Sequence, residues 1–569
     1  MGGTGDKTMK NKYIDLMEKT LSAYTTEHII RFFDDVKRDG LTEHGFPRLT
    51  ANIGILIANG RRSDLLPIFL QMMDFCCHAI PTVKAANDFS VREIVNCILE
   101  VEKSSLISHE DVARWKSLIA TIKPESCYSV YATAPDSPVK NWALFSGVSE
   151  YFRSELVGCD STEFIDVQIA SQLQWLDENG MYMDDDGEIH HPMMYDIVPR
   201  GLFAILLKRG YRGVYYHDID EALRKSALCT LYAQSTTGEV PFGGRSNQFL
   251  HNETWIALLF EYEAARYKRE GNIALAGKFK AAACKAIDVL IKWFSKEPIY
   301  HVKNRFPTDT KFGCEHYAYF DKYMITTASF LYAADTMCDD SIIPTETDES
   351  AIVWSTSRHF HKTFARAGGY FLEFDTNADP HYDASGLGRI HKAAAPSAIC
   401  LSMPFAKKPS YSIGNYENKT PFSICPAITD ASGTWRFSAE PDVRWIIVDR
   451  KCEKENVNVT FDCALGGGES IMFSCFADEN GVSLSASADE SQRVGIAFPI
   501  FHFDGESYTK ITEGKGRISL EYDGWICEYE AENITSLETE YANRNGIYKG
   551  YIACGIGKTS VKVKIYSKN

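Results

Sequence analysis

The pattern of apolar and polar residues divides the chain into two parts. From about residue 10 to about residue 340, apolar residues recur three and four positions apart in stretches such as YIDLMEKTLSAYT, SDLLPIFLQMMDFCCHAI and WALFSGVSEYFRSELV. This spacing is typical of helices, and glycine or proline lies in the gaps. Such a series of helical hairpins predicts a toroid or an α-solenoid. No repeat of fixed length is visible, which argues against the regular solenoids and favours an (α/α) toroid.

After the polar stretch DDSIIPTETDES (339–350) the period becomes two. Segments such as VRWIIVD, VNVTFDC and SVKVKIYS alternate and are rich in Val, Ile and Thr, as strands are. Strands and helices do not alternate, which excludes a Rossmann core, and the strings GGTG and GGG lack the context of a nucleotide-binding loop. We predict a catalytic toroid over residues 1–345 and an antiparallel β-sheet or β-sandwich domain over 346–569.

The charge balance narrows the classes of partner. The 569 residues are too many for one ordinary core, and their formal net charge is -16. No basic stripe or Lys/Arg block appears, so we expect neither a nucleic-acid partner nor a membrane partner. A polyanionic substrate would need a local basic pocket within this acidic protein. A homo-oligomer is compatible with the sequence.

The cysteines and the N-terminus predict a cytoplasmic protein. The stretch MGGTGDKTMKNKYIDLMEKT has no apolar segment of the signal-peptide type, and no later apolar run stands out as long enough to span a bilayer. The 16 cysteines are scattered singly apart from Cys76-Cys77 and form no CxxC pair, which argues against a zinc ribbon. We interpret them as reduced thiols.

Polar side chains gather in three predicted turns between helices of the first part. Because helix ends line the mouth of the central cavity of a toroid, we expect the three turns to converge on one cleft. Their residues are His190, His191, Tyr195, Asp196 and Arg200 in 177–201; Arg245, Asn247, Gln248, His251, Asn252 and Glu253 in 238–255; and Glu315, His316, Tyr317, Tyr319 and Tyr323 in 312–324.

The stretch FLHNETWIALLF, from Phe249 to Phe260, places a histidine and an asparagine directly before an apolar helical run. Asn252 suits the N-cap of a helix, and Glu253 suits the positive end of the helix dipole. This structural interpretation gives His251 no role. The alternative is that His251 and Asn252 take part in chemistry.

The layout and three short motifs resemble the heparinase II/III and oligoalginate lyase group of polysaccharide lyases. The matching stretches are HNETW (251–255), HYAYFDKY (316–323) and DENGMYMDDDGEIHHPMMY, the last similar to the family's Asp-Gly-then-His/Tyr turn. One pair reads His-Asn here where the family has Asn-His. The resemblance implies that Tyr317 is the acid, and the base for one C5 configuration, and that His251 and Asn252 neutralise a substrate carboxylate.

The chemistry of a uronate lyase explains why such residues are needed. Removing the C5 proton places charge on a carboxylate that is already negative, so donors such as His251, Asn252 and Arg245 must neutralise it. An acid must then protonate the leaving oxygen. Tyr317, with an ordinary pKa of about 10, donates well, and His251 or His316 could share the proton transfers. The residues expected to bind substrate in the three turns are Tyr195, Arg200, Asn247, Gln248, Glu253, Glu315 and Tyr319.

The β domain adds a His- and Asp-containing cluster at 358–392. We expect no required cofactor, but His359, His361 and Asp383, with His381 and His391 near them, have the ligand chemistry of a structural zinc. If His359 and His361 alternate on a strand, they share one face. A polar loop is the alternative, in which HYDASGLGRIHK, with His381 and Arg389, reaches the toroid mouth and contacts sugar.

Two other functions compete with an oligosaccharide lyase acting on short uronate-containing substrates. A glycoside hydrolase of the exo-glucuronidase or unsaturated glucuronyl hydrolase type would need two carboxylates. A non-catalytic scaffold with a carbohydrate-binding β module is less favoured, because three polar turns converge in one toroid. The carboxylates available to a hydrolase in the three turns are Asp196, Glu239, Glu253 and Glu315.

Overall fold

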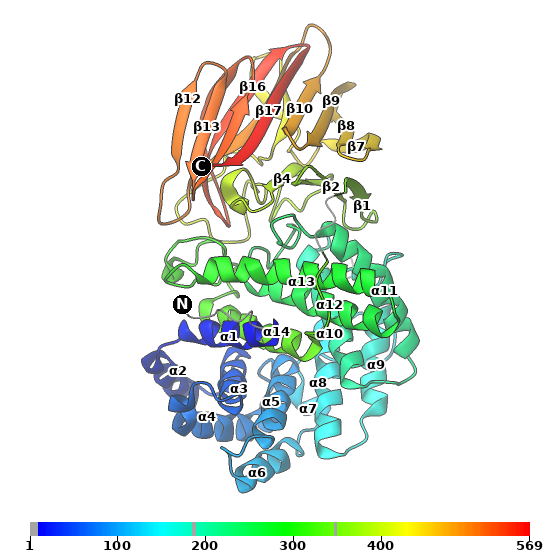
Figure 1. Cartoon of the computed structure of the whole chain (residues 1–569), viewed down its shortest axis with the longest axis vertical. Coiled ribbons are helices and arrows are strands. Elements are labelled where there is room, and N and C mark those ends of the chain that lie inside the picture. Colours follow the sequence, from blue (N-terminus) through cyan, green and yellow to red (C-terminus); the bar gives the residue numbers. More distant parts are fainter. Residues whose placement is uncertain (1–8, 185–188, 346–349, 569) are drawn as a thin grey trace.

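The chain folds into a helical domain followed by a β domain (Figure 1). A computed structural model describes residues 9–184, 189–345 and 350–568. The Asp186-Gly187 step of the predicted first turn and residues 346–349 of the predicted linker lie outside them. The helices are α1 (Met9–Ser22), α2 (Thr26–Asp39), α3 (Gly45–Ala58), α4 (Leu66–Ala79), α5 (Asn87–Glu102), α6 (His109–Ile119), α7 (Pro124–Cys127), α8 (Trp142–Val157), α9 (Thr162–Leu173), α10 (Met193–Arg209), α11 (Tyr216–Ala233), α12 (His251–Arg269), α13 (Ile273–Phe294) and α14 (Phe320–Met337).

Six helices of the described chain form a closed inner ring. α3 contacts α5, α5 contacts α8, α8 contacts α10, α10 contacts α12, α12 contacts α14, and α14 contacts α3. Each has an outer partner: α4 packs on α3, α6 on α5, α9 on α8, α11 on α10, α13 on α12 and α1 on α14. Helices packed on both sides must be apolar around most of their circumference, and α3 is buried from Gly45 to Ile57. The predicted (α/α) toroid is confirmed.

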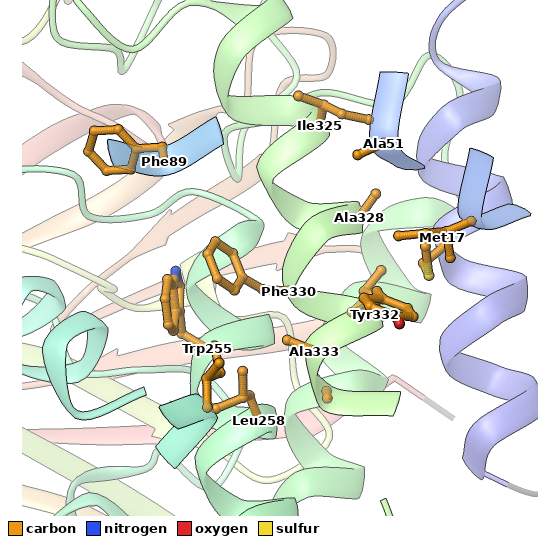
Figure 2. Close-up of a cluster of buried hydrophobic side chains, with 14 of the residues drawn as sticks. Met17, Ala51, Phe89, Trp255, Leu258, Ile325, Ala328, Phe330, Tyr332 and Ala333 are labelled. Carbon is orange, nitrogen blue, oxygen red and sulfur yellow. The ribbon is translucent and has the colours of Figure 1, made fainter. Parts of the chain in front are cut away.

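An aromatic pair holds two neighbouring ring helices together. The rings of Trp255 on α12 and Phe330 on α14 have centroids 3.6 Å apart, and Figure 2 shows them facing each other within the buried cluster. Gly201 on α10 lies against the same indole, and a Cβ there would come within 2.4 Å of Trp255. The missing side chain therefore lets α10 approach α12 closely. Truncating Trp255 to alanine would cost about 3–5 kcal/mol.

The β domain consists of three antiparallel sheets. Their strand orders are β1-β2-β3-β4, β12-β13-β14-β17-β10-β9-β8-β7 and β15-β16-β11-β5-β6. The strands are β1 (Ile352–Ser355), β2 (Lys362–Ala367), β3 (Tyr370–Asp375), β4 (Gly386–Lys392), β5 (Cys425–Thr429), β6 (Trp435–Phe437), β7 (Arg444–Cys452), β8 (Val457–Gly466), β9 (Glu469–Asp478), β10 (Gly481–Ser487), β11 (Arg493–Phe503), β12 (Lys510–Gly514), β13 (Arg517–Tyr522), β14 (Trp525–Glu530), β15 (Ile534–Asn543), β16 (Gly546–Ile556) and β17 (Lys558–Ser567).

The eight-stranded sheet packs one of its faces against strands of the two smaller sheets. Along β8, buried and partly exposed residues alternate, so the eight-stranded sheet covers the interior with one face only. Its strands contact β11, β16 and β5 of the five-stranded sheet and β1 and β2 of the four-stranded sheet. The strand β11 is buried on both faces from Val494 to Phe501. The predicted antiparallel stacking is confirmed, and the four-stranded sheet lies nearest the helices (Figure 1).

One helical segment departs from the sequence expectation. Ser63–Thr82 has the length and apolar composition of a membrane-crossing helix, although no such stretch was expected. It comprises α4 and a short turn at each end, and α4 packs against α3 and α6. Its residues buried in the helical core are Phe69, Met72, Met73, Cys76 and Cys77.

The cysteines are unpaired throughout. All 16 lie in the described part of the chain, and none forms a disulfide bond. Most are buried, and burial raises the pKa of the Cys76 thiol to about 12. The buried thiols are therefore packing residues, and the absence of disulfide bonds among the described residues agrees with the prediction of reduced thiols, while the cytoplasmic location stays a prediction.

Candidate active site

The inner ring encloses a cavity of about 470 Å³ to which every ring helix, or the residues just before it, contributes side chains. The walls include the aromatic side chains of Phe89, Trp142 and Phe330. The polar residues of the lining come from α3, α10, α12 and α14 and from the residues before α3, α8, α12 and α14. They are His44, Arg48, Lys140, Asn141, Tyr195, Arg245, Ser246, His251, Tyr317, Lys322, Tyr323 and Thr326.

The cavity is basic although the protein is acidic. Arg48, Lys140, Arg245 and Lys322 line it, and no aspartate or glutamate of the described residues does. Arg48 is the most enclosed of these cations, and burial lowers its pKa to about 10. Its Nη1 donates to Thr326 at 2.7 Å, and its Nε forms a buried ion pair with Glu93 at 3.5 Å. The local basic pocket that an anionic substrate needs is therefore present.

Two tyrosine hydroxyls meet at Ser246. The Ser246 Oγ lies 3.0 Å from the Tyr317 hydroxyl and 3.2 Å from the Tyr195 hydroxyl. Ser246 has a φ of 57°, an uncommon backbone conformation for a residue with a side chain. Its N–H donates to Glu315 at 2.6 Å, and its carbonyl accepts from Asn252 at 3.1 Å. The serine is thus held on both sides of its backbone.

The loop before Ser246 is shaped by close packing against the start of α10. At Gly244, where φ is 73°, a Cβ would lie 2.8 Å from the Cβ of Pro192. The backbone N–H of Gly244 donates to Asp383 of the β domain at 2.7 Å. Only glycine allows this approach, which brings Ser246 beside Tyr195 of α10.

The two tyrosines lie in different electrostatic surroundings. Burial, followed by the nearby Tyr195 and the carboxylate of Glu315, raises the pKa of Tyr317, so this hydroxyl keeps its proton at neutral pH. Tyr195 instead has the guanidinium of Arg245 over its ring, 4.5 Å from the centroid. Arg245 also forms an ion pair with Asp184, which neutralises part of its charge. Tyr195 therefore lies beside a cation, whereas Tyr317 lies beside the carboxylate of Glu315.

His251 lines the cavity as a neutral imidazole. Burial and the charges of Arg48, His301 and Lys303 lower its pKa to about 3. The ring stacks on Phe249, with centroids 5.6 Å apart, and its Nδ1 has no hydrogen-bond partner. A neutral imidazole donates from one nitrogen and accepts at the other.

The prediction that Asn252 caps the helix is wrong. α12 begins one residue earlier, at His251, after Leu250, which makes no side-chain cap. The loop folds back so that the Ser246 carbonyl comes within reach of the fully buried Asn252 amide. Asn252 therefore holds the loop and does not line the cavity. Glu253 pairs with Lys303 instead of sitting freely at the helix start.

Several residues predicted to bind substrate lie outside the cavity. Arg200 makes an ion pair with Asp196 and donates to Thr230 at 2.7 Å, because it points toward α11. Asn247 donates to the Pro241 carbonyl and accepts from Gln248, so both amides are used within the loop. These side chains stabilise the helices and the loop around the cavity without lining it.

Only some of the candidates in the third turn line the cavity. Tyr317 lines the cavity, whereas Glu315 lies behind Ser246, bound by Arg544. His316 is exposed and meets the Tyr317 ring edge-on, with centroids 5.4 Å apart. Tyr319 precedes α14 and lies outside the cavity lining.

The β-domain candidates do not reach the cavity. His381 is exposed and lies outside the lining. Arg389 is fully buried, where it pairs with Glu373 and donates to the Val240 carbonyl at 2.7 Å. The predicted contact of this segment with sugar is therefore not supported by its position. Arg389 instead ties β4 to the loop that leads to α12.

The proposed zinc ligands do not form a metal-binding group among the described residues, although His361 and Asp383 line one small cavity. His359 and His361 lie in the turn before β2 rather than on a strand, so the predicted shared face is wrong. Asp383 is fully buried and accepts from Gly244, and burial raises its pKa to about 7. His391 hydrogen-bonds Ser235 and Ser402. No group of three or more His, Cys, Asp or Glu among the described residues is arranged for a metal, so these contacts give the zinc hypothesis no support.

The sequence analysis did not identify the cavity residues of α3 or those directly before α8. Arg48 is the only charged residue in the α3 sequence GFPRLTANIGILIA. A charged residue is rarely buried unless it is paired, so an arginine inside this helix indicated either a buried ion pair or a polar cavity. At the start of α8, Lys140 lies 3.8 Å from the centroid of the Trp142 ring, and Asn141 donates to Asp184.

Comparisons with known proteins give structural likeness only. No protein-family model and no curated protein matches the sequence. The structure is similar to a chondroitin AC lyase of Streptomyces coelicolor A3 in complex with chondroitin sulphate, with 11% identity over 98% of this chain and 83% of that chain and a TM-score of 0.49. It is also similar to heparan sulfate lyase HepC from Pedobacter heparinus, with 12% identity over 88% of this chain and 75% of that chain and a TM-score of 0.37. A Paenibacillus xanthan lyase is similar with 8% identity over 92% of this chain and 53% of that chain and a TM-score of 0.47.

All three are polysaccharide lyases, the group that the sequence resembles. Their TM-scores lie below 0.5, so the argument for function rests on the cavity itself.

Proposed function

We propose that the protein is a lyase that cleaves uronic-acid-containing oligosaccharides by β-elimination. The observation that carries the proposal is a basic cavity without a lining carboxylate, in which two tyrosine hydroxyls meet at one serine. The cations suit an anionic sugar, and tyrosine is one of the side chains that can act as a general acid or base. The enclosed position of the cavity within the helix ring favours a short substrate.

The basic groups meet the largest demand of the reaction. When the C5 proton leaves, its electrons delocalise onto the uronate carboxylate, and nearby positive charge or hydrogen-bond donors stabilise the resulting enolate. Arg245 and His251 remain in the neutralising set expected from sequence, because both line the cavity. Arg48 joins them, whereas Asn252 leaves the set because its amide is bound to Ser246.

The two tyrosines divide the proton transfers in this proposal. Tyr195, beside the Arg245 guanidinium, takes the C5 proton as phenolate. The electron pair forms the C4–C5 double bond, the C4–O bond breaks, and the leaving oxygen takes the proton of Tyr317. Ser246, within hydrogen-bond distance of both hydroxyls, then passes the proton from Tyr195 to Tyr317. The sequence had suggested Tyr317 for both steps.

The carboxylate positions argue against the glycoside hydrolase alternative. A hydrolase needs two carboxyl groups beside the scissile bond, roughly 5–10 Å apart. Asp196 pairs with Arg200, Glu315 with Arg544, and Glu239 and Glu253 with Lys303. None of the four lines the cavity. They stabilise the toroid and its loops instead.

The experiment that tests the proposal separates elimination from hydrolysis. The protein is incubated with sulfated and unsulfated uronate disaccharides and tetrasaccharides, and ultraviolet absorbance and product mass are followed together. A lyase gives an unsaturated product that absorbs in the ultraviolet and lacks the mass of one added water. Products that carry the added water and do not absorb would establish a hydrolase and refute the proposal.

A further inference from the structure

A second cavity, of about 240 Å³, lies between the helical domain and the β domain. Its walls include Trp293 on α13, Arg305 in the segment after α13, Tyr522 at the end of β13, and Asn545 in the turn between β15 and β16. It shares no lining residue with the cavity inside the ring. The two cavities are therefore separate sites.

Arg305 in this cavity is buried without an ion pair to a described residue, although the carboxylates of Asp504 and Glu506 are near enough to favour its charged form. The residue is 3% exposed, and its Nε and Nη2 have no hydrogen bond. The guanidinium stacks on Trp293, 4.7 Å from the ring centroid, and no ion pair with a described carboxylate is present. Asp504, a neighbouring carboxylate in the same wall, is already engaged by the Tyr522 hydroxyl at 2.8 Å. A buried cation left unpaired is costly, which points to an anion from outside the chain.

Acceptors without a hydrogen bond line the same cavity. The Oε2 of Glu239 and the Oδ1 of Asn545 are buried and have no hydrogen bond. The Oε2 of Glu239 is in an ion pair with Lys303 at 3.7 Å, and Lys303 donates to Glu253 instead. Acceptors of this kind suit hydroxyl groups, which a bare inorganic anion lacks.

We propose that this interdomain cavity binds a sugar acid. Its carboxylate lies against Arg305, whose planar guanidinium suits two parallel hydrogen bonds, and its hydroxyls donate to Glu239 and Asn545. Lys292 lines the cavity and is exposed, so it adds positive charge at the entrance. Pockets for drug-sized ligands measure roughly 300–1,000 Å³, so this smaller cavity suits one sugar unit. The site is independent of the proposed lyase activity.

The test titrates the full-length protein with glucuronate, read by tryptophan fluorescence and by calorimetry. We expect saturable binding that Arg305→Gln weakens by about tenfold or more and that Lys292→Glu also weakens. Arg269→Glu makes the same charge change on the exposed end of α12 and serves as the control. Trp293→Phe should remove the fluorescence signal, whereas Trp142→Phe, in the ring cavity, should not.

Stability separates lost binding from lost folding. Because Arg305 is an unpaired buried cation, Arg305→Gln should unfold at the same or a higher temperature than the native sequence while losing the ligand. Glucose and sulfate are titrated in parallel. Equal binding of glucose, binding of sulfate but not glucuronate, or unchanged glucuronate binding in both Arg305→Gln and Lys292→Glu would overturn the proposal. These results leave the ring cavity and its lyase assay unaffected.

Discussion

Both terminal nitrogens of Arg544 donate to the carboxylate of Glu315, at 2.6 and 2.9 Å. Arg544 lies in the turn between β15 and β16, and both side chains are fully buried. The same carboxylate accepts the N–H of Ser246 at 2.6 Å. The β domain therefore helps to fix the serine on which the two tyrosine hydroxyls meet, and its contribution to the site is one of positioning.

Replacing Arg544 with methionine should strongly destabilise the protein. The change leaves the Glu315 charge buried without its cation, and breaking a buried ion pair in this way costs about 3–5 kcal/mol. The double variant with Glu315→Gln should regain part of this loss, because no unpaired charge then remains. The free energy of unfolding in urea measures both effects.

The control for this prediction is Arg436→Met. Arg436 pairs with Asp442, whose side chain is 68% exposed and stays solvated when the cation is removed, so the loss should stay below about 1 kcal/mol. Equal losses for the Arg544 and Arg436 variants would contradict the positioning role of the buried pair.

Tyr317→Phe and Tyr195→Phe should each reduce turnover by about 10²–10⁴-fold while leaving the fold intact, because each removes one proton-transfer group. Both hydroxyls bond to Ser246, so the relay fails in either variant. Steady-state rates on a uronate oligosaccharide, with circular dichroism as a check on folding, measure the effect.

Tyr319→Phe is the matched control, since Tyr319 belongs to the same segment but lies outside the cavity. A Tyr195 variant with near-native turnover would assign both proton transfers to Tyr317, as the sequence had suggested.

The architecture was predictable because it depends on local periodicity. Apolar spacing of three and four predicted the helices that close into the ring, and alternation predicted the antiparallel sheets. The turn argument also placed Tyr195, Arg245, His251 and Tyr317 in one cleft, because residues at helix ends of a toroid share its mouth.

The remaining residues depend on contacts that no local pattern encodes. Arg544 and Glu315 are 229 positions apart, so only the docking of the two domains pairs them. Asn252 satisfies the local rule for a cap, but the positive φ of Ser246 turns a carbonyl toward it and changes its role. Arg48 gave a compositional signal, yet the side of α3 that faces the cavity follows only from the closed ring.

Stability should fall as the solution becomes acidic, partly because of His251. Its pKa is about 3 in the folded protein, against an ordinary value of 6.5, so the unfolded chain takes up the proton first. The stabilisation is present in full above about pH 6.5 and is lost as pH falls toward 3. Between pH 7 and pH 5 this histidine alone should account for about 2 kcal/mol.

His251→Gln removes this titration. The difference in unfolding free energy between pH 7 and pH 5 should therefore become smaller by about 2 kcal/mol. The same substitution at the exposed His316 serves as the control. An unaltered slope in the His251 variant would mean that the imidazole is not buried as a neutral group.

Asn252→Asp should lose both stability and activity, in contrast to the behaviour of a helix cap, where aspartate replaces asparagine well. The Asn252 amide donates to the Ser246 carbonyl from a fully buried position. An aspartate cannot donate there when ionised, and it places a charge beside a carbonyl oxygen, so at least about 1–3 kcal/mol of stability is lost. Ser246 is then released from one of its two backbone contacts, and turnover falls.

Asn272→Ala is the control: Asn272 caps α13 by accepting the Leu275 N–H at 3.1 Å, and its loss should cost about 1 kcal/mol with unchanged turnover. Thermal unfolding and rate measured on the same preparations decide the matter, and an Asn252→Asp protein as stable and active as the native one would return Asn252 to the role of a simple cap.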